Sequence, residues 1–260
     1  MKLIITLIII ILILTLCLII GRNEANTIKR KDPAIKSIFE VFLYPGFWAI
    51  LMHRLSHRIY KMHLFFISRL TSQLARILTG IEIHPGATIG KGVFIDHGMG
   101  VVIGETCEIG DNVTIYQNVT LGGTGKDSGK RHPTIGNNVL IGAGAKVLGP
   151  ITIGDDCKIG AGSVVLNDTI ANQTIVGIPA RSVERSITDS SPSDNLDQIR
   201  LPDPIEIELC KLREEIIKLE SKFNTTNKPT DKAEIENSID KIAEIADEIT
   251  KIKEDNNETL

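Results

Sequence analysis

The sequence predicts a mainly β protein: a parallel β-helix in its central part, preceded by an α-helical domain and followed by a helical or coiled-coil extension. The first observation behind this fold class is an aliphatic residue at every sixth position, and the second is a glycine directly after most of these residues. A period of six fits neither an α-helix nor an alternating strand. It is typical of a solenoid in which each short strand and turn lies on the previous one. The repeated positions are Ile83, Ile89, Ile95, Ile103, Ile109, Ile115, Leu121, Ile135, Ile141, Val147, Ile153, Ile159 and Val165.

The third observation is that the residue two places before each repeated aliphatic is usually small or β-branched. We expect these side chains to point into the same core, and they are Ala87, Val93, Cys107, Val113, Val119, Val139, Ala145, Cys157 and Ser163. Cys107 and Cys157 are therefore interpreted as core residues rather than reactive groups. The four cysteines of the chain show no spacing of a metal or redox pair.

The repeat loses its phase twice within the predicted β-helix domain, which we assign to residues 81–187. Two extra residues lie between Ile95 and Ile103, and eight lie between Leu121 and Ile135. A solenoid places insertions in loops, often on its binding face. We therefore look for chemistry at these two breaks.

Each break contains a histidine beside a charged residue, in Asp96-His97 and in Arg131-His132. A histidine next to an acid suits general base catalysis near neutral pH, and an arginine suits bidentate binding of a carboxylate. Glycines within residues 122–125 would let a loop approach a ligand closely. These residues alone predict acyl transfer to a small hydroxyl or amine; surface histidines without a role are the alternative.

Residues 3–20 form an apolar run that only Thr6 and Thr15 interrupt. About 18 apolar residues are enough for a transmembrane helix, so residues 1–21 are interpreted as an N-terminal anchor. More basic residues follow the run than precede it, which predicts a membrane-anchored chain with its catalytic part in the cytoplasm. A signal peptide or a buried start is the alternative.

An α-helical domain is predicted over residues 22–80, because apolar residues recur at helical spacing from about residue 32 to residue 79. Pro45-Gly46 is expected to separate its first helix from its second. Its histidines, His53, His57 and His63, are interpreted as helix-contact residues rather than metal ligands.

The end of the chain is predicted to be a linker over residues 188–204, rich in Ser, Asp and Pro, and a helical tail over residues 205–260. Leu209, Leu212, Ile216, Leu219 and Phe223 alternate three and four apart, which is the spacing of a coiled-coil seam. A second apolar stripe runs from residue 235 to residue 249. A solvated, partly helical tail is the alternative, because each segment is marginal alone.

Composition argues against nucleic acid as a partner. The net charge is −3 at pH 7, so the sequence does not predict a basic surface of the kind that binds nucleic acid.

One alternative function is that of a zinc-dependent carbonic anhydrase on the same solenoid. It needs three histidines that converge on the metal. Only His84, His97 and His132 lie in the coils, and no further histidine follows His132 in its loop. We therefore expect no metal site, and metal analysis of the purified protein would decide between the two functions.

Several motifs together resemble the serine O-acetyltransferases, over roughly residues 32–181. They are Asp32-Pro33-Ala34, Tyr44-Pro45-Gly46-Phe47, the His53 to His57 segment, Ile83-His84-Pro85-Gly86, Asp96-His97-Gly98, Gly104-Glu105-Thr106, the Thr120 to Gly125 segment, Arg131-His132-Pro133 and the Gly142 to Lys146 segment. The hexapeptide coils alone would indicate only an acyltransferase superfamily. The Asp-Pro-Ala element, the Asp-His-Gly break and the Arg-His-Pro loop are more specific.

The resemblance implies a left-handed β-helix and direct transfer of acetyl from acetyl-CoA to the hydroxyl of L-serine, within a ternary complex, giving O-acetyl-L-serine for cysteine synthesis. By matching position, His97 would be the general base, and Glu82 its acidic partner, often Asp in the family. The other matching site residues would be Asp32 and Asp96 for the serine ammonium, Arg131 for its carboxylate with His132 assisting, and Glu105 near the site.

The resemblance also implies that acetyl-CoA lies in a groove between adjacent β-helices, which needs a homotrimer or a dimer of trimers. The matching cofactor positions are Gly123, Thr124, Ala143, Lys158 and Ala161. In some members the C-terminus, ending in Ile, docks into O-acetylserine sulfhydrylase. This chain ends in Leu260, so that partner stays open. Another acceptor, such as homoserine or a sugar, and a non-catalytic membrane scaffold are the remaining alternatives.

Overall fold

The computed structural model describes residues 21–125, 128–183, 204–225 and 241. The chain divides into two compact units, Met1–Leu201 and Pro202–Leu260, which we take separately. Of the predictions above, the anchor over residues 3–20, the linker over 188–203 and the second apolar stripe of the tail lie outside the described residues. No helix in the described part of the chain is long and apolar enough to cross a membrane.

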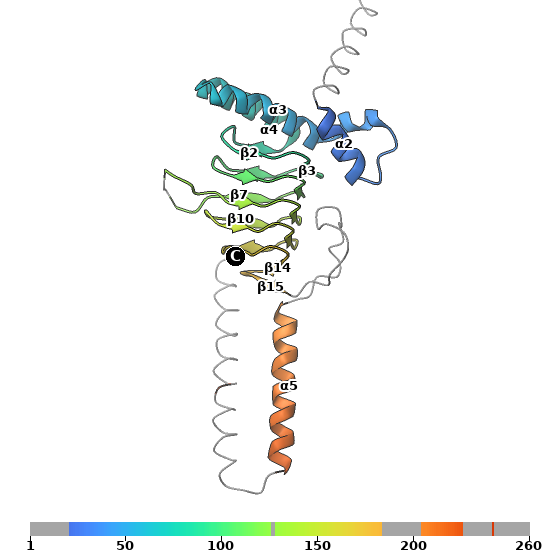
Figure 1. The fold of residues 1–260 in the computed structure, drawn as a ribbon, viewed down its shortest axis with the longest axis vertical. Helices are drawn as coiled ribbons and strands as arrows, with labels where there is room; N and C mark the ends of the chain where they lie inside the picture. The colour runs from blue at the N-terminus through green and yellow to red at the C-terminus, as the bar shows by residue number, and fades with distance from the viewer. Residues whose placement is uncertain (1–20, 126–127, 184–203, 226–240, 242–260) are drawn as a thin grey trace, which may run out of the picture. The chain divides into compact units, whose positions relative to one another are not determined.

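The first unit contains a parallel β-helix of short strands (Figure 1). The strands are β1 (Glu82–Ile83), β2 (Thr88–Ile89), β3 (Phe94–Ile95), β4 (Val102–Ile103), β5 (Glu108–Ile109), β6 (Thr114–Ile115), β7 (Thr120–Gly122), β8 (Thr134–Ile135), β9 (Leu140–Ile141), β10 (Lys146–Leu148), β11 (Thr152–Ile153), β12 (Lys158–Ile159), β13 (Val164–Val165), β14 (Thr174–Gly177) and β15 (Ala180–Val183). They form three sheets: sheet A with the order β1-β4-β7-β10-β13, sheet B with β11-β8-β5-β2, and sheet C with β15-β14-β12-β9-β6-β3.

The six-residue ladder forms the core, as predicted. Ile83 pairs with Ile103, and Ile103 with Leu121, so each aliphatic residue stacks on its counterpart three strands later. Every repeated aliphatic position is 5% exposed or less, and all nine small or branched positions named above are buried. Both side-chain predictions for the solenoid are therefore confirmed.

Close approach between the backbones of successive coils explains several of the glycines that follow the aliphatic residues. Gly90, Gly110, Gly136 and Gly154 lie directly above one another at the corner between sheets B and C. A Cβ added at Gly110 would lie 2.9 Å from the carbonyl carbon of Gly136, so close backbone approach excludes a side chain. The positive φ of the turn falls two residues later, for example at Gly92, where φ is 68°.

From residue 21 on, four helices precede the β-helix: α2 (Arg22–Lys31), the 3₁₀-helix η1 (Ile38–Leu43), α3 (Pro45–Lys61) and α4 (Phe65–Thr79). The first of these helices begins at Arg22, earlier than residue 32, where the helical spacing of apolar residues begins in the sequence. Pro45 is the first residue of α3, a position at which the missing N–H of proline loses no intrahelical hydrogen bond. Figure 1 shows α3 and α4 across one end of the stacked coils. They pack against each other and against β1.

Polar contacts hold this helical cap on the solenoid. The Lys31 Nζ at the end of α2 is buried and donates to the Asn112 carbonyl and to Thr114 Oγ1, both at 2.8 Å. From α3, the Arg54 guanidinium donates to the backbone carbonyls of Ile89 and Gly90. These contacts set the position of Asp32, the residue directly after Lys31.

The second unit contains α5 (Pro204–Thr225), which agrees with the helix predicted for the first half of the tail. Within this helix Leu209, Ile216 and Ile217 are exposed. A coiled-coil seam along α5 therefore stays a prediction.

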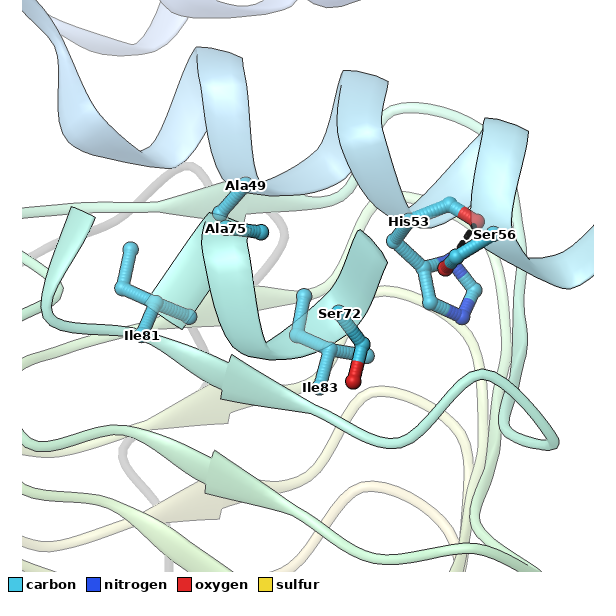
Figure 2. Close-up of a pocket in the computed structure, with 7 residues that line it drawn as sticks. All are labelled: Ala49, His53, Ser56, Ser72, Ala75, Ile81 and Ile83. Atoms are coloured by element: carbon cyan, nitrogen blue, oxygen red, sulfur yellow. Dashed lines mark hydrogen bonds between the residues drawn. The ribbon is translucent and has the colours of Figure 1, made fainter. Parts of the chain in front are cut away.

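A small buried pocket lies between α3, α4 and β1, lined by His53, Ser72 and apolar side chains including Ile81 and Ile83 (Figure 2). His53 is 3% exposed, and its ring stacks on His57 with 5.6 Å between centroids. Neither ring nitrogen of His53 has a hydrogen-bond partner among the described residues. This agrees with the interpretation of His53 as a helix-contact residue.

We expect His53 to make the protein less stable in mild acid. Burial, with the charge of Arg54 and the neighbouring His57, lowers the pKa of His53 from 6.5 to about 3. Only the unfolded chain then takes up this proton between pH 6.5 and 3, so the free energy of unfolding falls as pH falls, by about 1.4 kcal/mol per pH unit. Urea unfolding at several pH values should show a shallower dependence in His53→Leu; equal slopes for the two chains would contradict the prediction.

Candidate active site

The first predicted break is a loop at the corner where the chain passes from sheet C to sheet A. Between β3 and β4, His97 takes a left-handed backbone conformation with φ of 56°, and its side chain is 74% exposed. The His97 Nε2 lies 3.9 Å from Asp96 Oδ1, and the same oxygen accepts a hydrogen bond from the His97 backbone N–H at 2.9 Å. The imidazole is thus presented to solvent beside a carboxylate.

A second carboxylate, that of Asp32, reaches the same corner from the end of α2. Asp32 Oδ1 accepts from the Ala34 N–H at 2.7 Å, and Oδ2 accepts from the Tyr44 hydroxyl. Burial first, and then the bond to Asp32, raise the pKa of Tyr44 to about 12. The hydroxyl therefore stays a donor that orients this carboxylate.

The two carboxylates, Asp32 and Asp96, lie close enough to repel each other. Burial raises the pKa of Asp96, His97 opposes this shift, and the negative charge of Asp32 adds to it. Tyr116, in register with Asp96 on the next coil, has a pKa raised by burial and then by both carboxylates. Two neighbouring carboxylates favour a cation between them. The arrangement suits an ammonium group.

The second predicted break lies at the other edge of sheet A, where the chain passes to sheet B. Arg131 and His132 follow β7 in this loop, and Arg131 Nη2 donates to Glu105 Oε2 at 2.7 Å. Glu105 Oε1 accepts from the Tyr60 hydroxyl of α3 at 3.2 Å. A carboxylate held by a helix therefore orients the guanidinium. Glu105, whose predicted role was only proximity to the site, contacts Arg131 directly.

His132 is buried at this corner, against Thr106. Burial and the positive charge of Arg131 lower the pKa of His132, and Glu105 opposes this shift. His84, which follows β1 in the first coil, also has its pKa lowered, first by burial and then by Arg69. Both rings are therefore neutral at pH 7.

Glu82, the predicted acidic partner of His97, lies on β1. Its carboxylate forms ion pairs with two arginines of α4, Arg69 at 3.2 Å and Arg76 at 3.0 Å. Among the described residues no ion pair joins Glu82 to His97, so this dyad stays a prediction.

Four of the five predicted cofactor residues are divided between the same two edges of sheet A. Ala143 and Ala161 lie at the sheet C to sheet A corner, where the Gly162 N–H donates to the Ala143 carbonyl at 2.8 Å. Gly123 and Thr124 lie at the sheet A to sheet B corner. Lys158 is half-buried on β12 of sheet C.

Sequence reasoning assigned no role to Tyr44, Tyr60 or Thr106, which support the charged groups. Two of them stand inside quoted motifs, Tyr44 before Pro45 and Thr106 after Glu105, which is the signal that could have found them. No cluster of three or more His, Cys, Asp or Glu able to hold a metal ion exists in the described part of the chain.

Comparison with known proteins gives the family. Residues 86–123 and 132–167 match the family described as bacterial transferase hexapeptide (six repeats). The serine acetyltransferase of Bacillus subtilis (strain 168) is 54% identical over 203 residues, 78% of this chain and 93% of the relative. That of Helicobacter pylori (strain ATCC 700392 / 26695) is 61% identical over 157 residues, 60% of this chain and 92% of the relative.

A solved structure of Neisseria gonorrhoeae serine acetyltransferase in complex with serine is 40% identical, with a TM-score of 0.61, over 65% of this chain and 70% of that chain. With the three parallel sheets, this likeness confirms the predicted left-handed β-helix preceded by helices. The identities are high and extend over nearly the whole of the relatives, and the chain therefore belongs to the serine acetyltransferase family.

Proposed function

We propose that the protein transfers the acetyl group of acetyl-CoA to the hydroxyl of L-serine, giving O-acetyl-L-serine for cysteine synthesis. Its family membership supports this activity, as does the serine bound to a relative. The observation that carries the proposal is the pair of carboxylates, Asp32 and Asp96, beside the exposed imidazole of His97. The guanidinium of Arg131 lies at the opposite edge of the same sheet. The carboxylates match the ammonium of serine, the imidazole its hydroxyl, and the guanidinium its carboxylate.

In the proposed reaction His97 is the general base. Its neutral imidazole takes the proton of the serine hydroxyl while the serine oxygen attacks the acetyl carbonyl carbon. The tetrahedral intermediate collapses, the carbon–sulfur bond breaks, and the CoA sulfur leaves with the proton that the imidazolium returns. An acidic partner, proposed as Glu82, would hold the ring and stabilise its charged form.

Serine is held through its two charged groups. Asp32 and Asp96 bind the ammonium, which relieves their mutual repulsion. Arg131, whose Nη2 donates to Glu105, binds the carboxylate, since the planar fork of a guanidinium matches carboxylate geometry. His132 assists at this end of the substrate.

We propose that two copies of the chain complete each site, within a homotrimer that stands alone or pairs into a dimer of trimers. The base and both carboxylates lie at one edge of sheet A, while Arg131 and His132 lie at the other. The cofactor residues are divided in the same way, with Ala143 and Ala161 beside the base. Placing one edge of a subunit against the other edge of its neighbour joins both sets and leaves a groove for acetyl-CoA.

The activity is tested by release of the CoA thiol from acetyl-CoA by the full-length chain. L-serine, homoserine and a simple galactoside are offered separately. We expect release with serine alone. Release with another acceptor would overturn the substrate, and no release with any of them would overturn acetyl transfer.

We propose further that the apolar run over residues 3–20 anchors the enzyme to a membrane, with its catalytic part in the cytoplasm. The run is long enough to cross a bilayer, and exposed basic residues such as Arg22 and Lys29 follow it. The same assay on washed membranes and on supernatant tests this: activity confined to the supernatant would contradict the anchor. Docking of Leu260 to O-acetylserine sulfhydrylase stays a prediction, because Leu260 lies outside the described residues.

A further inference from the structure

We propose that Thr106 fixes His132 in the tautomer that carries its hydrogen on Nε2, so that His132 is a neutral hydrogen-bond donor to the substrate carboxylate and not a second base. Thr106 is thus a positioning residue. This inference rests on the proposed function for the identity of the substrate, but the tautomer is a property of the protein alone.

The first argument is a backbone hydrogen bond. The Thr106 N–H donates to His132 Nδ1 at 3.1 Å. A backbone amide nitrogen can only donate, so Nδ1 must present a lone pair. A neutral imidazole with a lone pair on Nδ1 carries its hydrogen on Nε2.

The second argument is that all hydrogen-bonding sites of the Thr106 hydroxyl, two acceptor sites and one donor, find partners only in this tautomer. Its oxygen accepts from the backbone N–H of Arg131 at 3.1 Å and from that of His132 at 3.2 Å. A hydroxyl has two acceptor sites and one donor, so its hydrogen is left for His132 Nδ1, which lies 2.9 Å away. The same side chain thus holds the loop backbone and selects the tautomer of the ring.

The third argument concerns the other edge of the ring. His132 Nε2 lies next to Gly104 and Gly123, two glycines of sheet A. A Cβ at Gly104 would be 2.2 Å from Nε2, and one at Gly123 would be 3.2 Å away. Only glycine at position 104 leaves room for the ring. The Nε2–H is therefore directed along the sheet edge where Gly123 and Arg131 are found.

Burial and the charges around the ring keep it neutral. Burial is the largest effect on the pKa of His132, Arg131 and Lys130 lower this pKa further, and Glu105 opposes the shift. The net effect is a lowered pKa for His132. A neutral Nε2–H beside Arg131 can donate to a carboxylate oxygen.

The test compares Thr106→Val, which removes the hydroxyl at similar volume, with Thr106→Ser, which keeps it. In ¹⁵N-histidine NMR of the substrate-free full-length enzyme, assigned with His132→Gln, we expect His132 to carry its hydrogen on Nε2 in the wild type and in Thr106→Ser. In Thr106→Val the backbone N–H still donates to Nδ1 but the hydroxyl no longer does, so the Nε2–H form should stay the major one while the Nδ1–H form gains some population. Hydrogen on Nδ1 in the wild type would overturn the proposal without any assay.

Kinetics separate positioning from a general structural role. We expect Thr106→Val to raise the serine KM by about tenfold, the effect of one hydrogen bond, with a smaller change in kcat and in the KM for acetyl-CoA, and Thr106→Ser to restore it. If Thr106→Val leaves the KM for L-serine unchanged, Thr106 has no positioning role. The same conclusion follows if kcat falls as much as the KM rises and Thr106→Ser does not restore the wild-type values. If the wild type acetylates no serine at all, the proposed function fails, and the NMR result still decides the tautomer.

Discussion

Replacing His97 by asparagine should lower kcat by about two to four orders of magnitude, the range expected for loss of a general base. Asparagine is the better probe than alanine because His97 has a φ of 56°, and asparagine adopts this left-handed conformation readily. The substitution therefore removes the imidazole and leaves the loop backbone unstrained. Binding of CoA, measured by calorimetry, should stay close to that of the wild type.

A matched control for this variant exists in the same chain. His63, in the turn between α3 and α4, is also exposed and also left-handed, with a φ of 60°. His63→Asn thus makes the same chemical and conformational change away from both edges of sheet A, and its kcat should be unchanged. Near-normal turnover in His97→Asn, or an equal loss in both variants, would contradict the assignment of His97 as the base.

Coexpressing two impaired variants should restore activity if each site takes groups from two copies of the chain. His97→Asn has lost the base at one edge of sheet A, and Arg131→Ala has lost the carboxylate-binding group at the other. In a trimer assembled at random from equal amounts, about a quarter of the sites combine an intact His97 from one copy with an intact Arg131 from its neighbour. Coexpression should therefore recover about a quarter of wild-type turnover.

The comparison is with the two variants purified separately and mixed after assembly, which should show only the sum of their own activities. A coexpressed mixture that also shows no more than this sum would mean that one chain supplies a whole site. The experiment needs no measurement of oligomer size, because the recovered activity itself shows that one edge of sheet A in one copy meets the other edge in a second copy.

The solenoid could be predicted in detail because its repeat is local. The six-residue repeat identifies the core positions of each coil from the local sequence. Ile103 and Val139 can therefore be placed in the core without knowledge of any distant segment. The two loops were also predictable, since an insertion breaks the period. The glycines and the close backbone approach that requires them were predicted, but which backbone each glycine faces needed the register of the coils.

Contacts between segments far apart in the sequence were not predictable in this way. Lys31, the last residue of α2, is a charged residue whose burial is explained by its hydrogen bonds to Asn112 and Thr114, 81 and 83 positions later. Likewise Glu82 was matched to an acid beside His97, while α4 brings two arginines to it. The sequence predicts which groups form the site, whereas their partners depend on how the helices pack on the coils.

A stack of parallel coils has two open ends, and each would template another coil or another molecule. Here α3 and α4 lie over the first coil, and at the opposite end β15 pairs with β14 in the antiparallel direction (Figure 1). The reversal interrupts the parallel progression that every earlier strand follows. In the described part of the chain, neither end of the parallel stack therefore continues the ladder, so neither offers a template for end-to-end growth into a fibre.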